Sequence, residues 1–86
     1  GRANERICDR WVEVRRLGSG FAAVHMVLIE DAELGKYVDV QNTAAGRWEL
    51  WEMADEEAEA YALGLGIRYE RKKPLYEPRP KEPDHG

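Results

Sequence analysis

Phe21-Ala22-Ala23-Val24-His25-Met26-Val27-Leu28-Ile29 is the most apolar run in the chain, and the fold depends on it. Its one polar residue is His25, two glycines lie just before it, and two acidic residues follow it. Apolar residues occupy both alternating sets, so a strand here is apolar on both of its faces. A short run of this kind is typical of a central β-strand, and fits a buried helix less well. We therefore expect residues 21–29 to form an interior strand.

The residues before this run predict its first neighbour. Trp11-Val12-Glu13-Val14 combines an aromatic with two β-branched residues, which favours a strand over residues 10–17. A helix is the alternative, because apolar residues between Ile7 and Leu17 also recur at helical spacing. Gly18-Ser19-Gly20 then predicts a hairpin loop in which glycine supplies a positive φ.

Three later segments also alternate as strands do. In residues 37–41 the alternation places Val38 and Val40 inward. Residues 47–53 alternate again, although a long helix beginning near Thr43 is an alternative that Gly46 disfavours. Residues 67–71 predict a final edge strand whose charges discourage pairing with another edge.

From Ala54 the period becomes helical. Ala54, Ala58, Ala62 and Leu65 recur on one face, acidic residues crowd the first turns, and Gly64 and Gly66 mark the end. The sequence therefore predicts a helix at about 54–64. Together these elements predict an α+β fold, a mainly antiparallel meander of four to five strands with one helix packed on one face.

The domain limits follow from length and from proline. Eighty-six residues are enough for one domain with a thin core, which we place at residues 1–73. Residues 74–86 contain all four prolines and predict an extended or disordered C-terminal tail. The sequence has no apolar run near the ~20 residues of a spanning helix and no basic-then-apolar leader, so we expect no membrane association.

Charge is unevenly distributed behind the net value of −4. Residues 30–59 contain ten acidic side chains and two basic ones, whereas both ends of the chain are locally basic. An acidic middle argues against a protein that primarily binds nucleic acid, since affinity for phosphates depends on a basic face. Cys8 is the only cysteine, so an internal disulfide is excluded and we expect a cytoplasmic protein.

The sequence supplies no set of catalytic residues. His25 is one of two histidines, and a general base or a metal site needs further partners that no motif provides. A structural role is the simpler expectation for His25 and for Cys8. We accordingly predict no enzymatic activity, no cofactor and no metal.

Aromatic and charged residues are the candidates for interaction. Aromatic side chains often anchor interfaces, and the candidates are Trp11, Trp48, Trp51 and Tyr69. If residues 47–53 form a strand, Trp48 and Trp51 lie on opposite faces, one buried and one exposed. An acidic surface is expected from Glu49, Glu52, Asp55, Glu56, Glu57 and Glu59. Possible basic contacts are Arg15, Arg16, Arg71, Lys72 and Lys73.

The function expected from these patterns is non-enzymatic protein–protein interaction. One short helix covers only one face of a sheet whose central strand is apolar on both, so a partner protein or a second copy is expected to cover the other. We expect a small accessory protein, of the kind that mobile or viral genomes encode, which self-associates through a sheet face or edge. The alternative is a binding module for a small ligand or single-stranded nucleic acid that uses exposed tryptophans and the flanking basic segments.

Overall fold

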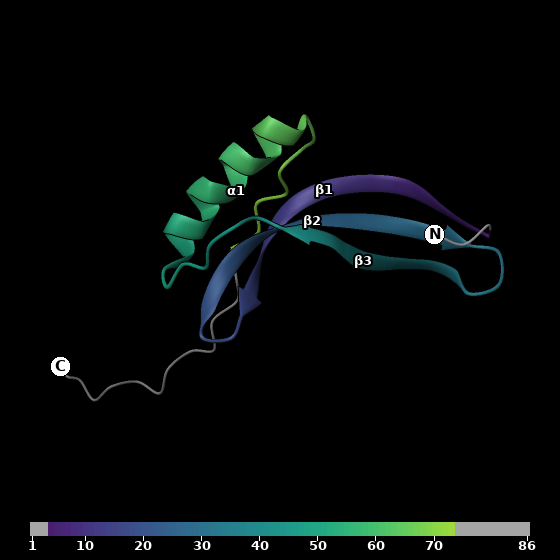
Figure 1. Ribbon diagram of the computed structural model, residues 1–86, viewed down its shortest axis with the longest axis horizontal. Coiled ribbons are helices and arrows are strands. Elements are labelled where there is room, and N and C mark those ends of the chain that lie inside the picture. Colours follow the sequence, from purple (N-terminus) through teal and green to yellow (C-terminus); the bar gives the residue numbers. More distant parts are fainter. Residues whose placement is uncertain (1–3, 74–86) are drawn as a thin grey trace.

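The structure is a computed structural model that describes residues 4–73 (Figure 1). Three antiparallel strands form one sheet in the order β1-β2-β3, and one helix follows them. The elements are β1 (Glu5–Leu17), β2 (Gly20–Asp31), β3 (Gly35–Thr43) and α1 (Trp51–Leu65). The α+β class is therefore confirmed. So are the central strand over residues 21–29 and the strand, rather than the helix, over residues 10–17.

The prediction of four to five strands is wrong. Within residues 47–53 only Trp48 pairs with the sheet, through one antiparallel bridge to Phe21, and α1 begins at Trp51. Within residues 67–71 only Tyr69 forms a bridge, parallel to Val12. The long helix from Thr43 is wrong as well, because Gly46 has a φ of 100° and turns the chain. The proline-rich tail at residues 74–86 lies outside the described residues.

Two tight hairpins join the strands. Gly18 has a φ of 62° while the following Ser19 has no positive φ, which is the pattern of a type II′ turn. Gly35, with a φ of 85°, ends the turn between β2 and β3. In that turn the Asp31 carboxylate accepts hydrogen bonds from the backbone N–H groups of Glu33 and Leu34. These turns set the register, since each strand pairs with the next from the turn outward.

Helix α1 packs against one face of the sheet through small side chains. Its buried residues are Trp51, Ala54, Ala58 and Ala62. The alanines lie against Val12 and Ala23 in one cluster, while Trp51 and Ala54 contact Phe21 in a second. Gly66 ends the helix with a φ of 74° and donates its N–H to Ala62. Of the helices in the described part of the chain, none is long and apolar enough to cross a membrane.

The sheet continues past the helix. Figure 1 shows α1 lying over one half of the sheet, while the half that carries the β2–β3 turn extends beyond it. The contacts of α1 are accordingly with β1 and β2, near the β1–β2 hairpin. We use the term open face for the side of the sheet turned away from α1.

The open face differs from the sequence expectation in two ways. Ala22, Val24 and Met26 of β2 point to it and are nevertheless buried, because longer side chains on β1 and β3 close over them. From the sequence, the centre of this face is expected to need a partner to cover it, but the chain itself covers these three residues. Val38 and Val40 of β3, expected inward, are instead about half exposed (51% and 46%), since no element within residues 4–73 packs on this face.

The close packing of α1 against the sheet gives the first prediction. Replacing Ala58, which is fully buried, with leucine (Ala58→Leu) forces extra bulk between α1 and the sheet. We expect the free energy of unfolding to fall by about 1–3 kcal/mol. Ala60→Leu, on the exposed side of the same helix, serves as the matched control and changes it by less than about 0.5 kcal/mol. Urea denaturation of both variants measures the difference, and equal effects would contradict the packing described here.

Candidate functional site

A hollow on the open face of the sheet is lined largely by apolar residues. Its volume is about 240 Å³. The register places its members side by side on three strands, since Arg15 pairs with Ala22 and Thr43 with Val24. The lining residues are Arg15, Arg16, Leu17, Ala22, Val24, Val40 and Thr43. We call this site the hollow; it combines an apolar floor with the Arg15 side chain on its β1 side, whereas the Arg16 side chain turns to the opposite face, over Phe21.

Charge around the hollow is partly compensated. Glu13 accepts a hydrogen bond from the Trp11 indole at 2.7 Å and lies 3.4 Å from the Arg15 guanidinium. The Arg15 guanidinium also reaches the Met26 sulfur at 3.9 Å, so it extends across the sheet. Arg16 lies 4.9 Å from the centre of the Phe21 ring. The Arg15 side chain is half exposed, and its carboxylate partner Glu13 also accepts a hydrogen bond from Trp11. The rim of the hollow therefore remains receptive to a negative charge.

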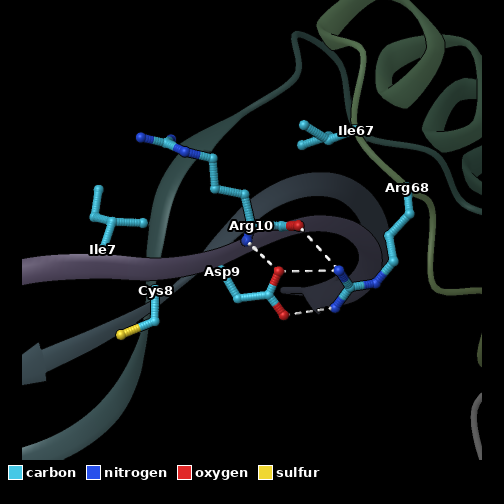
Figure 2. A pocket seen from close by; sticks show the side chains of 6 residues that line it. All are labelled: Ile7, Cys8, Asp9, Arg10, Ile67 and Arg68. Carbon is cyan, nitrogen blue, oxygen red and sulfur yellow. Dashed lines mark hydrogen bonds and ion pairs between the residues drawn. The ribbon is translucent and has the colours of Figure 1, made fainter.

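The free edge of β1 is closed by side chains and by the segment after α1. Val12 donates its N–H to Arg68 and accepts from the N–H of Glu70, so this segment pairs with the edge. Figure 2 shows Arg68 reaching across to Asp9, with which it forms an ion pair at 2.9 Å. Asp9 also accepts the N–H of Arg10, and Arg68 donates to the Arg10 carbonyl. The depression of about 370 Å³ drawn in Figure 2 is therefore crossed by internal hydrogen bonds.

The edge of β3 is partly closed in the same way. Val40 donates its backbone N–H to the Asp39 carboxylate at 2.8 Å, and Thr43 donates to the Asn42 side chain at 2.9 Å. Both N–H groups are thereby taken up by the side chain of the preceding residue. Edge strands protected in this manner pair poorly with further strands. The exposed faces, rather than the edges, are left as the surface available to a partner.

The aromatic candidates are placed differently from the prediction. Trp51 is buried (8% exposed) and Trp48 is half-buried, and both contact the cluster around Phe21. They do not lie on opposite faces, because the predicted strand at 47–53 is absent. Tyr69 packs on the core, and Trp11 is half-buried on the open face beneath Arg68, at 5.4 Å. The indole nitrogens of Trp48 and Trp51 are buried without a hydrogen-bond partner in the described part of the chain.

The acidic candidates divide into an internal pair and an exposed group. Asp55 accepts hydrogen bonds from the Tyr69 hydroxyl and from Arg71, and Arg71 also lies 3.2 Å from Glu59. Burial raises the pKa of Asp55, but the hydrogen bonds from Arg71 and Tyr69 outweigh it and hold this pKa below its usual value. Glu49, Glu52 and Glu56 are exposed and Glu57 is half-buried, and none of these four makes an ion pair within residues 4–73.

Two of the basic candidates, Arg16 and Lys73, come together at the β1–β2 hairpin end of the sheet. Arg16 covers the Phe21 ring, and the Lys73 ammonium lies 5.8 Å from the Trp51 ring in the same aromatic cluster. Arg47, which the sequence analysis did not select, reaches Ser19 at 3.2 Å and packs over Gly20. No ion pair joins Arg16, Arg47 or Lys73 to a carboxylate in the part of the chain that the structure describes. Lys72 is exposed, and Arg71 is held by Asp55.

His25 and Cys8 lie apart from the hollow. His25 is opposite Val12 in the register, on the α1 side of the sheet, and its Nε2 is buried without a partner in the described chain. Burial, followed by the charge of Arg10, lowers the pKa of His25. Cys8 is exposed at an irregularity in β1 and lies 3.8 Å from Glu30. Residues 4–73 contain no group of three or more His, Cys, Asp and Glu side chains placed to hold a metal ion.

The hydrogen bonds of Asp55 give the second prediction. Because its pKa is lowered by folding, the ionised carboxylate stabilises the fold above the unfolded pKa of about 3.9, and this contribution is lost as the pH falls. We expect Asp55→Asn to reduce the free energy of unfolding by about 1 kcal/mol at pH 7 and by progressively less below pH 4. Denaturation at a series of pH values measures this convergence. Glu49→Gln, an exposed control, should follow the wild type, and a constant deficit for Asp55→Asn would contradict the assignment.

The described residues thus offer one apolar hollow with a basic rim, one helix surface rich in unpaired carboxylates and one cluster of cations over aromatic rings. The first two are suited to contact with another protein, and the third to an anionic group. Comparisons of the chain with models of protein families, with curated proteins and with solved structures found no match.

Proposed function

We propose that this protein is a non-enzymatic interaction module that self-associates through the open face of its sheet. The observation that carries the proposal is the half-exposed apolar side chains around the hollow. Leu17 and Val40 line the hollow, and Val38 lies two residues from Val40 on the same face of β3; these three are between 46% and 51% exposed. Contiguous exposed apolar surface on a small domain is typical of a protein interface.

The shape of this surface supports a face contact rather than strand addition. Asp39 and Asn42 take up N–H groups along the edge of β3, while Arg68 and Asp9 close the edge of β1. A partner that adds a strand must first displace these side chains. A partner that packs against the open face displaces none of them.

A second copy of the chain is the proposed partner. The rim of the hollow contains Arg15, whereas the exposed surface of α1 contains carboxylates that form no ion pair within residues 4–73, such as Glu52 and Glu56. Each protomer therefore offers surfaces of opposite charge. Such complementarity favours association of like chains.

The third prediction tests self-association. Light scattering over a concentration series should show a mass above that of one chain for the wild type. Replacing both exposed valines (Val38→Glu with Val40→Glu) introduces charge into the apolar surface and should return the protein to a monomer. Leu34→Glu is the matched control, because Leu34 is 71% exposed in the β2–β3 turn away from the hollow. A wild type that stays monomeric at every concentration rules the proposal out.

A second candidate function is supported by the cations at the β1–β2 hairpin end. Arg16 and Lys73 lie far apart in sequence, yet both lie over rings of one aromatic cluster, and neither is paired with a carboxylate within residues 4–73. Arg47 lies beside the same hairpin. This arrangement supports binding of a phosphate-bearing ligand such as single-stranded nucleic acid. The burial of Trp51 argues against base stacking on its ring.

The fourth prediction concerns this second candidate. Fluorescence anisotropy of a labelled single-stranded oligonucleotide at low salt should detect binding that weakens as salt rises. The double variant Arg16→Gln, Lys73→Gln should lower the slope of log K against log salt by about 0.7 per lost phosphate contact. Lys36→Gln, near the β2–β3 turn, is the control and should leave the slope unchanged. No binding of the wild type at low salt removes this candidate.

A further inference from the structure

One surface of α1 carries charge and an apolar side chain in a single line. Glu52, Glu56, Glu59 and Leu63 follow one another at intervals of four, three and four residues. At 3.6 residues per turn they lie within about 60° of one another around the helix axis. All four are exposed, and Leu63, at 82%, is the most exposed of the large apolar residues in the described chain. We call these four residues the acidic stripe.

The fold uses only one charge of the acidic stripe, that of Glu59. The buried residues of α1 lie on a different side of the helix, where they meet the sheet. Within residues 4–73, Glu52 and Glu56 form no ion pair, and Glu59 has one, with Arg71. A leucine in this position loses nothing inside the chain when it is buried by a partner. The carboxylates beside it restrict that partner to a surface with positive charge.

The hollow is such a surface. Its floor of Ala22, Val24 and Val40 is apolar, and the Arg15 side chain supplies positive charge on its β1 side. The volume of about 240 Å³ accommodates one branched aliphatic side chain. Arg15 is half exposed and lies 3.4 Å from its single carboxylate, so it is free to form a closer pair.

A protomer cannot fill its own hollow with its own stripe. Helix α1 is packed on one face of the sheet, and the hollow lies on the opposite, open face. The stripe and the hollow are different surfaces of one chain. Two copies can therefore form two such contacts about a two-fold axis, or each copy can contact the next head to tail.

We infer that the hollow on the open face receives the acidic stripe of α1 from a second copy, with Leu63 inserted over Val24 and Val40 and the stripe carboxylates beside Arg15. This inference rests on the self-association proposed above and specifies which surface of the second copy takes part. The apolar contact supplies the affinity, and the carboxylate–arginine pairs set the orientation.

The fifth prediction uses two single variants that are defective in different surfaces. Val40→Glu places a carboxylate in the hollow, and Leu63→Glu removes the inserted side chain; both positions are exposed, so neither change disturbs the core. Sedimentation velocity should show each variant alone with self-association weakened at least about tenfold, the loss expected at a central contact. An equimolar mixture should form a one-to-one complex, because one variant still has an intact hollow and the other an intact stripe.

The controls separate failure of this inference from failure of the proposed function. Leu34→Glu should associate like the wild type, and circular dichroism should show the same thermal unfolding for all variants. If Leu63→Glu associates like the wild type while Val40→Glu does not, the open faces pair with each other; the inference is then overturned while the proposed function stands. If the wild type is itself monomeric, both are overturned. A mixture of the two variants that remains monomeric also overturns the inference.

Discussion

The close contact between the alanines of α1 and the paired strands β1 and β2 determines the rest of the structure. Ala58 and Ala62 lie against Val12 and Ala23, where larger side chains do not fit. Aromatic residues pack around this contact, with Phe21 and Trp51 in a neighbouring cluster and Tyr61 and Tyr69 against the alanines themselves. The small side chains between helix and sheet and the aromatic bulk around them fix where the helix lies. A helix seated in this way covers one face of the sheet and leaves the other open.

The open face is stable in water because of its own side chains. Its centre, formed by Ala22, Val24 and Met26, is buried although the described part of the chain places no second layer on it. Arg15 extends across it, and Trp11 and Glu13 are joined at its side by a hydrogen bond. Long amphipathic side chains that lie along apolar surface provide this kind of cover. Apolar exposure is thereby confined to the flanks, which is why the candidate interface is a small patch and not the whole face.

The sequence predicts the elements whose signals are local. Gly18 marks the first hairpin, and the apolar run at 21–29 marks the central strand. The helix is predicted over 54–64 and observed over Trp51–Leu65. The helical spacing of the alanines is visible from Ala54 onward, whereas Trp51 fits the alternation of a strand as well, so the first turn is not predicted. These features depend on neighbours in the chain, so one sequence is sufficient to find them.

The errors arise where contacts distant in sequence decide the structure. The spacing of Trp48 and Trp51 fits a strand and a helix equally well, and only the contact of Trp51 with Phe21 settles it. Val38 and Val40 alternate as inward residues do and share one face of β3, but they are buried only if another layer covers that face. The hollow depends on the register of three strands, which includes irregularities near Cys8 and near His25. No single segment contains that information.

The backbone hydrogen bonds of Asp9, Asp39 and Asn42 have a consequence for solubility. Fibrillar cross-β stacking requires rows of bare amide groups that recruit identical segments from other chains. At three places along the two outer strands of this chain, the side chain of an Asp or Asn accepts a hydrogen bond from the backbone N–H of the next residue. The exposed apolar side chains of this protein are therefore flanked by strand edges that offer few free N–H groups for stacking with other chains.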